Sequence, residues 1–132
     1  MTAAALVETI GGWIEHDILR TAAEGATPII GVAGCQGSGK STLARGLAEQ
    51  FGAATLSLDD VYLTKAERAE RARDVHPLFA TRGPPGTHDL ALLHAVLNRL
   101  TTAGPNDRSA LPRFDKLADE RSAEAVWLVV TG

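Results

Sequence analysis

The sequence has a single cysteine, few aromatic residues and no long apolar run. Because Cys35 is the only cysteine, the chain can form neither an intramolecular disulfide nor a zinc site built from cysteines. The 13 basic and 16 acidic residues leave a net charge of −3, which argues against a nucleic-acid-binding surface. No run reaches membrane-spanning length, and the N-terminus lacks the basic start and apolar block of a signal peptide. We therefore expect a cytoplasmic protein that binds neither nucleic acid nor membrane, and whose oligomeric state the sequence leaves unknown.

Length and composition set the scale of the fold. At 132 residues, the chain is long enough for one modest domain with a core of its own. Its apolar content of 45% is ordinary for a globular protein, so disorder is not expected.

The stretch from Gly34 to Ser41 reads G-x-x-x-x-G-K-S, the phosphate-loop pattern. The β-branched apolar run at 27–33 before it predicts a buried parallel strand. The run at 42–51 after it has apolar residues at helical spacing and predicts a helix. A chance glycine-rich turn is the alternative to a nucleotide site. The predicted nucleotide-binding residues are Gly34, Cys35, Gln36, Gly37, Ser38, Gly39, Lys40, Ser41 and Thr42.

The chemistry of this loop is anion capture. Glycines allow successive backbone N–H groups to point into one concavity, and the helix N-terminus adds its positive dipole end. Lys40 is expected to reach the β- and γ-phosphates of ATP, and the Ser41 hydroxyl to ligate Mg²⁺. Cys35 occupies a variable position of the pattern, either as a small filler or as a redox switch.

An acidic pair follows the next predicted strand. Periodicity predicts a helix from about residue 3 to residue 23, interrupted by Gly11-Gly12, and a second strand at 54–58 that ends in Asp59-Asp60. In a right-handed βαβ unit the carboxyl ends of parallel strands share one edge, so the pair is expected on the same edge as the loop. The alternative is that the two aspartates only form a turn or cap a helix.

The rest of the chain alternates charged and turn-rich segments. Thr64 to Glu67 resembles a capping box that opens a charged segment, interpreted as a solvated helix face. The segment 81–89 is a stiff, turn-rich connection whose Thr87 or Asp89 can cap a helix from Leu90. The segment 110–116 is either an edge strand with a solvated turn or a segment turned into a cleft, and 125–130 predicts a buried strand.

Four blocks together resemble the glycerate kinase branch of the phosphoribulokinase/uridine kinase group of P-loop kinases: GVAGCQGSGKST, LSLDDVYLT, TRGPPGTHD and LPRFDK. The first block is shared by many nucleotide-hydrolysing proteins, and the third and fourth are the more specific. The resemblance implies a P-loop NTPase-type, three-layer α/β fold with a mainly parallel sheet, truncated at the C-terminus. We expect residues 1–132 to form one incomplete kinase domain, with 1–26 as a helical extension and 27–132 as the nucleotide-binding core.

The resemblance also implies roles for individual residues. Asp59 matches the catalytic carboxylate that orients the acceptor hydroxyl, acting with Lys40, and with Ser41 it is expected to hold Mg²⁺. The implied reaction is ATP-dependent phosphoryl transfer to a hydroxyl of a small carboxylic acid, D-glycerate first. Arg113 and Lys116 are expected to bind a carboxylate or phosphate. The implied acceptor-site residues are Asp60, Tyr62, Arg82, His88, Asp89, Arg113 and Lys116.

Two departures from the family bear on activity. Thr131 stands where the family has a metal-binding glutamate, and the family continues beyond Gly132 into further strands and a basic lid. We therefore expect weak or absent turnover from this polypeptide alone. The alternatives are a uridine- or pantothenate-type kinase and a non-catalytic nucleotide-binding remnant. A switch GTPase is disfavoured because neither N-K-x-D nor D-x-x-G occurs.

Overall fold

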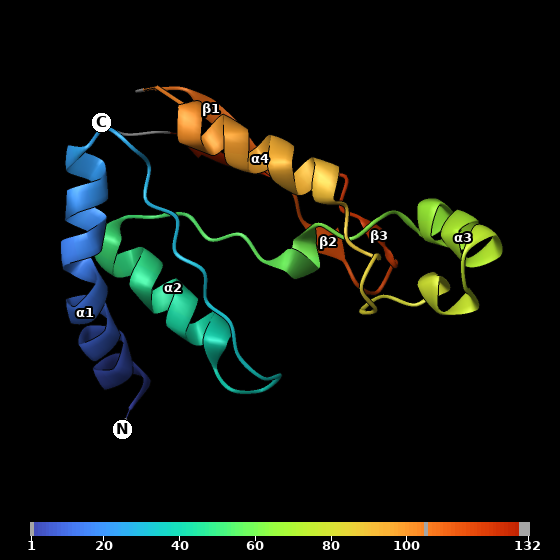
Figure 1. Cartoon of the computed structure of the whole chain (residues 1–132), viewed down its shortest axis with the longest axis horizontal. Helices are drawn as coiled ribbons and strands as arrows, with labels where there is room; N and C mark the ends of the chain where they lie inside the picture. Colours follow the sequence, from blue (N-terminus) through green and yellow to red (C-terminus); the bar gives the residue numbers. More distant parts are fainter. Residues whose placement is uncertain (1, 105, 130–132) are drawn as a thin grey trace. The chain divides into compact units, whose positions relative to one another are not determined.

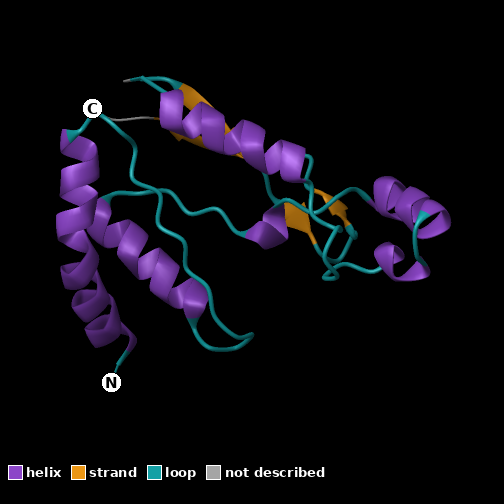
Figure 2. Ribbon diagram, viewed as in Figure 1, coloured by secondary structure: helices purple, strands orange, loops and turns teal. Residues whose placement is uncertain are grey.

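The computed structural model describes residues 2–104 and 106–129 (Figures 1 and 2). The chain divides into two compact units, Met1–Thr55 and Leu56–Gly132. The first contains the predicted phosphate loop, and the second contains the predicted acceptor residues.

Among the described residues, the regular secondary structure of the first unit consists of two packed helices. Helix α1 (Ala3–Ala23) begins at Thr2, whose hydroxyl accepts a hydrogen bond from the amide of Ala5 at 3.1 Å. Helix α2 (Lys40–Phe51) packs against α1 and buries Leu47. Both helices agree with the helices predicted from the apolar spacing, and α2 begins two residues earlier than expected.

Glycines explain how closely α1 and α2 approach each other. Gly11 is buried, and a Cβ atom added to it would collide with the side chain of Gln50. A Cβ atom on Gly46 would lie 2.5 Å from Cγ2 of Val7. Glycine inside a helix costs about 1 kcal/mol relative to alanine, but here its missing side chain makes room for the other helix. Gly11-Gly12 therefore does not interrupt α1.

The structure differs from prediction at the first two strands. Residues 27–33 and 53–57 carry neither helix nor strand, and Leu58 belongs to a short 3-10 turn, η1 (Leu58–Asp60). A parallel strand exists only through hydrogen bonds to a neighbouring strand. Neither segment has such a partner within residues 2–104 and 106–129, so the β-rich composition alone does not make them strands.

The second unit surrounds its core with short helices and two antiparallel strand pairs. Its helical elements are α3 (Lys65–Asp74), η2 (Pro77–Ala80) and α4 (Leu90–Thr102). β1 (Arg108–Leu111) pairs with β4 (Val126–Val129), and β2 (Phe114–Asp115) pairs with β3 (Glu120–Arg121). Strand β4 agrees with the predicted strand at 125–130, and β1 and β2 favour the edge-strand interpretation of 110–116. Val130, Thr131 and Gly132 lie outside the described residues.

Caps and apolar contacts fix the second unit. Thr64 and Glu67 form the predicted capping box at the start of α3, and Asp89 caps α4 by accepting a hydrogen bond from the amide of Leu92 at 2.9 Å. Helix α4 packs on β1. The buried apolar side chains of this unit are Val61, Tyr62, Leu63, Val96, Leu111 and Phe114. Three of them follow the Asp59-Asp60 pair directly, so the core itself holds that pair in place.

Candidate functional site

The predicted phosphate loop leads directly into α2. The amide of Ser38 donates to the carbonyl of Cys35 at 3.1 Å, which closes a turn. Gly37 and Gly39 have φ values of 77° and 88°, a left-handed conformation that favours glycine. A Cβ atom on Gly34 would lie 2.9 Å from the Ser38 hydroxyl oxygen. The positive φ therefore favours glycine at position 39, which the pattern specifies, and at position 37, which the pattern leaves variable.

The N-terminus of α2 is open to an anion. Its N-cap residue, Gly39, supplies no side-chain hydrogen bond to the first turn. The first backbone N–H groups of a helix have no partner within the helix, and the helix dipole adds positive potential there. Lys40, Ser41 and Thr42 form that first turn, and Ser41 and Thr42 are exposed. This arrangement suits a bound phosphate group.

In the second unit, Asp59 lies between a cation and a phenol. The Asp59 carboxylate accepts hydrogen bonds from the Lys116 ammonium at 3.2 Å and from the Tyr62 hydroxyl at 3.2 Å. Partial burial acts to raise the pKa of Asp59, but Lys116, through its hydrogen bond and its charge, and the hydroxyl of Tyr62 outweigh it and lower the pKa below its ordinary value. Burial, the Asp59 charge and the same hydrogen bond raise the pKa of Tyr62. Asp59 is therefore an ionised hydrogen-bond acceptor at neutral pH.

Tyr62 and His88 are joined by backbone and ring contacts. They form an isolated antiparallel bridge, and their rings stack with centroids 4.5 Å apart. Hydrogen bonds from the amide of Leu63 to the carbonyl of Thr87 and from the amide of Asp89 to the carbonyl of Val61 flank this bridge. The segment after the Asp59-Asp60 pair is thus held against the T-H-D end of the turn-rich connection, which brings two of the four sequence blocks together.

The other predicted acceptor residues take structural partners in the same unit. The carboxylate of Asp60 accepts from the amide of Phe114 at 3.1 Å and lies 3.6 Å from the guanidinium of Arg113. Asp89 caps α4 with one oxygen and pairs through the other with Arg121 at 3.3 Å. Asp60 thereby ties the L-P-R-F-D-K block to the aspartate pair, and the capping alternative for Asp89 is the one observed.

Sequence reasoning missed the buried arginine of this unit. Arg68 lies in the charged segment interpreted as a solvated helix face, but it is only 1% exposed. Its guanidinium donates to the carbonyls of Leu63 and Ala80 and to Asp119. That interpretation was wrong for Arg68, because three backbone carbonyls and one carboxylate oxygen accept hydrogen bonds from its guanidinium. An arginine at the position where an amphipathic helix would carry an apolar residue was the available signal.

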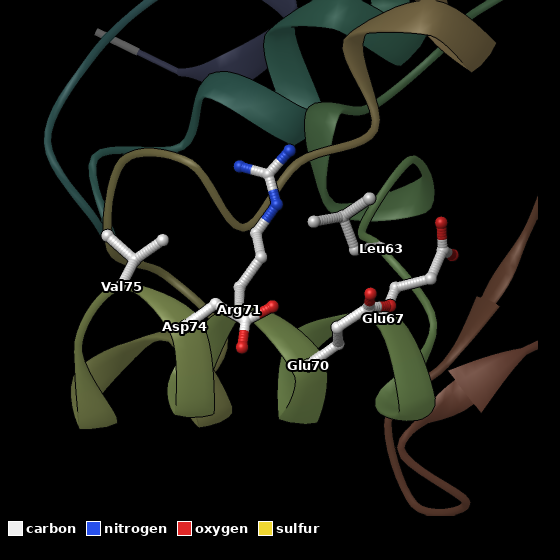
Figure 3. Close-up of a pocket in the computed structure, with 6 residues that line it drawn as sticks. All are labelled: Leu63, Glu67, Glu70, Arg71, Asp74 and Val75. Carbon is white, nitrogen blue, oxygen red and sulfur yellow. The ribbon is translucent and has the colours of Figure 1, made fainter.

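Two cavities adjoin α3. One, of about 300 Å³, is drawn in Figure 3, where the Arg71 side chain extends from the helix between Leu63 and Val75. Three carboxylates on α3 also line it, those of Glu67, Glu70 and Asp74. The other, of about 380 Å³, is lined by Leu63, Glu67, Arg71, Gly86, His88, Asp89, Leu90 and Ala91. Of the predicted acceptor residues, His88 and Asp89 therefore border a hollow, while Asp59 and Lys116 lie at an exposed surface.

The side chains offered for Mg²⁺ have suitable chemistry. Mg²⁺ prefers oxygen ligands and is held by one or two protein groups together with nucleotide phosphates. Ser41 supplies an exposed hydroxyl and Asp59 an ionised carboxylate. Among the described residues there is no group of three or more histidine, cysteine, aspartate or glutamate side chains able to hold a metal ion alone. Each side chain by itself suits a magnesium ion that arrives with a nucleotide, and the role of both as magnesium ligands stays a prediction.

The glycine-shaped loop and the open N-terminus of α2 define the class of P-loop nucleotide-binding proteins. Residues 29–131 match the family described as "AAA domain", and the chain belongs to that family. None of the helices in the described part of the chain is both long enough and apolar enough to cross a membrane.

Relatives extend the resemblance beyond the phosphate loop. The chain is 39% identical over 115 residues to "Uncharacterized kinase mug58" of Schizosaccharomyces pombe, covering 79% of this chain and 41% of the relative. It is 35% identical over 96 residues to "Probable ATP-dependent kinase TDA10" of Saccharomyces cerevisiae, covering 63% of this chain and 33% of the relative. The chain therefore spans less than half the length of these relatives.

Solved structures give the same result. A D-glycerate 3-kinase from Cryptococcus neoformans superposes with a TM-score of 0.73 at 32% identity, covering 97% of this chain and 49% of that one. The structure of the YGR205w protein superposes with a TM-score of 0.70 at 26% identity, covering 94% and 49%. The predicted P-loop fold class and the resemblance to the glycerate kinase-like branch are confirmed.

Proposed function

We propose that this chain carries the nucleotide loop and the acceptor residues of an ATP-dependent small-molecule kinase. The proposed reaction is transfer of the γ-phosphoryl group of ATP to a hydroxyl of a small carboxylic acid, and D-glycerate is the first candidate. The observation that carries the nucleotide half is the uncapped N-terminus of α2 behind the left-handed glycines Gly37 and Gly39. Lys40, in the first turn of α2, would neutralise phosphate charge.

The acceptor half depends on Asp59 and Lys116. An ionised carboxylate can accept the proton of an attacking hydroxyl or orient that hydroxyl. Both side chains of the ion pair are more than half exposed, Asp59 at 52% and Lys116 at 60%. An exposed ion pair contributes only about 0–1 kcal/mol, so a substrate carboxylate can recruit the ammonium of Lys116 at little cost. Arg113, paired with Asp60 at 3.6 Å, offers a second cation of the same kind.

D-Glycerate suits these groups because it carries both a carboxylate and hydroxyls. A site with a lysine or arginine for the one and an aspartate for the other recognises both ends of the molecule. The similarity to a D-glycerate 3-kinase supports this acceptor. Uridine and pantothenate are the acceptors of the alternative proposal, and uridine offers no carboxylate to pair with Lys116 or Arg113.

ADP release in the presence of Mg²⁺ and ATP tests the proposal, with D-glycerate, uridine and pantothenate compared in the natural protein that carries this chain. D-Glycerate should give the highest kcat/KM. Asp59→Asn should lower kcat by about 10² to 10⁴, the range of a general acid–base group. Asp107→Asn is the matched control, because Asp107 is not one of the predicted acceptor residues and its exposed carboxylate accepts a hydrogen bond from the amide of Gly104. Equal rates for Asp59→Asn and the wild type would refute the role of Asp59.

A non-catalytic nucleotide-binding module is the second candidate. The sequence observation that favours it is Thr131, which cannot supply the negative charge of the glutamate expected there. Calorimetry separates the two functions: binding of Mg-ATP without ADP release on any of the three acceptors would support the module. Absence of Mg-ATP binding would refute both.

A further inference from the structure

Asp119 joins two arginines from distant parts of the second unit. Its side chain accepts a hydrogen bond from Arg82 at 2.8 Å and another from Arg68 at 2.6 Å. Arg68 is held almost completely buried and also donates to the Asp119 carbonyl at 3.1 Å. Asp119 has a φ of 55°, a conformation that aspartate and asparagine adopt more readily than most residues. Arg68 therefore anchors Asp119 by both its side chain and its backbone.

Arg82 connects Asp119 to the backbone of Lys116. The same terminal nitrogen of Arg82 that bonds Asp119 also donates to the carbonyl of Lys116 at 3.1 Å. The guanidinium lies 5.3 Å from the centre of the Phe114 ring, within the range of a cation–π contact. With its guanidinium over the Phe114 ring and one nitrogen shared between two acceptors, Arg82 already has partners on the protein.

The turn that carries Lys116 joins strands β2 and β3, and the pairing of Asp115 with Glu120 closes its base. Leu117, next along the chain, is fully exposed, so no apolar contact fixes the turn. The amides of Leu117 and Ala118 donate to the carboxylate of Asp115 at 3.0 Å and 3.1 Å, which closes the turn locally without attaching it to the rest of the unit. On the Lys116 side, the strand pairing ends at Asp115, and the hydrogen bond from Arg82 to the Lys116 carbonyl then holds the backbone of the turn. That bond fixes the backbone from which the Lys116 ammonium reaches Asp59.

We propose that Asp119 and Arg82 are positioning residues, which hold the Lys116 backbone so that its ammonium reaches Asp59, and that Arg82 does not itself bind the acceptor. This inference rests on the proposed function, in which Asp59 and Lys116 serve phosphoryl transfer. It replaces the prediction that Arg82 contacts the substrate. It also assigns a role to Asp119, which the sequence pattern did not single out.

Substitutions that replace a charged side chain by an uncharged one of similar size distinguish a positioning role from a substrate-binding role. Asp119→Asn keeps the size of the side chain and tolerates the left-handed backbone, but weakens the acceptor of Arg82. Arg82→Gln removes the donor to Lys116. Each should lower kcat about tenfold with the KM for ATP unchanged, since small misplacements of a reacting group cost rate. Because both act through one link, the double variant should fall about as far as either single variant, and Arg82→Lys should recover part of the loss.

A second readout does not require turnover. The side-chain ¹⁵N signal of Lys116, assigned by its loss in Lys116→Gln, reports how fast the ammonium protons exchange with water. Exchange should accelerate at least threefold in Asp119→Asn and in Arg82→Gln. Asp107→Asn, which removes an exposed carboxylate of the same unit, should leave the signal unchanged.

The outcomes distinguish this inference from the proposed function. Absence of wild-type turnover with every acceptor, together with faster Lys116 exchange in both variants, would refute the kinase and keep the positioning role. Unchanged Lys116 exchange in both variants would overturn the inference whatever the activity. In an active protein, additive losses in the double variant, or an Arg82→Gln effect confined to the KM of the acceptor, would show that Arg82 binds substrate directly.

Discussion

Replacement of Arg68 by methionine tests whether a buried cation organises the second unit. Methionine keeps an unbranched apolar stem and removes the guanidinium. Arg68 Nε donates to the carbonyl of Leu63 at 3.2 Å, Nη1 to that of Ala80 at 2.9 Å, and Nη2 to Asp119. The side chain is only 1% exposed. The substitution therefore leaves the carbonyls of Leu63, Ala80 and Asp119 and the Asp119 carboxylate without this donor.

The expected cost follows from which of these acceptors can reach water. Removing one partner of a buried charge pair costs about 3–5 kcal/mol. The side chain of Asp119 is 32% exposed and keeps Arg82 as a second partner, so its charge is not left unpaired. Ala80 is also exposed, while Leu63 is buried. We therefore take the lower end of the range and expect Arg68→Met to lower the free energy of unfolding of the second unit by about 3 kcal/mol.

Native-state amide hydrogen exchange measures this loss within the second unit alone. The amides of Leu63 and Asp89 are suitable reporters, because they donate to Thr87 and Val61 across the bridge that holds the acceptor residues. A loss of about 3 kcal/mol should lower their protection roughly 100-fold. Arg71→Met is the matched control: this exposed arginine lies one helical turn away and makes one hydrogen bond, to the carbonyl of Gly86 at 3.1 Å. It should cost less than about 1 kcal/mol. Equal losses for the two variants would refute the reasoning.

Three further predictions concern pH, packing and the nucleotide. The hydrogen bond from Arg68 lowers the pKa of Asp119 below 3.8 in the folded protein. The ionised Asp119 therefore contributes its full share to the free energy of unfolding above pH 3.8, and this contribution is lost as the pH falls through the lower folded pKa. In urea titrations at a series of acidic pH values, Asp119→Asn should reduce the loss of stability on acidification. Gly46→Ala should lower the melting temperature, because its Cβ would meet Val7 at 2.5 Å and such overpacking costs about 1–3 kcal/mol, whereas Gly12→Ala, with open space, should raise it slightly. Lys40→Met should weaken Mg-ATP binding at least tenfold by calorimetry, while circular dichroism stays unchanged.

Local patterns predicted the helices and the phosphate loop well. α1, α2, α3 and α4 all lie where apolar spacing, caps and turn residues indicated. These features depend on residues three or four apart, so a short window of sequence contains the whole cause. The loop is similar: the left-handed conformation of Gly39 falls at a glycine that the pattern specifies, and Gly37 adopts the same conformation at a variable position.

Features that depend on distant residues were not predictable in this way. The runs at 27–33 and 54–58 have the composition of strands but no strand partner within the described residues. The burial of Arg68 was not predictable either, because two of the residues that accept its hydrogen bonds, Ala80 and Asp119, lie 12 and 51 positions away in the sequence. The same holds for the partners of Arg82, which lie 34 and 37 positions along the chain.

Composition and motif alone established a small P-loop protein, whose glycines shape an anion-binding turn before a helix and whose later blocks carry an aspartate and several cations. The tertiary contacts determined which of those charged groups face one another. Lys116 meets Asp59, Arg113 meets Asp60 and Arg121 meets Asp89, while Arg68 and Arg82 share Asp119. The sequence contains the charged residues but does not specify their ion-pair partners, because water and salt screen the attraction between two charges unless folding brings them within a few ångströms of each other.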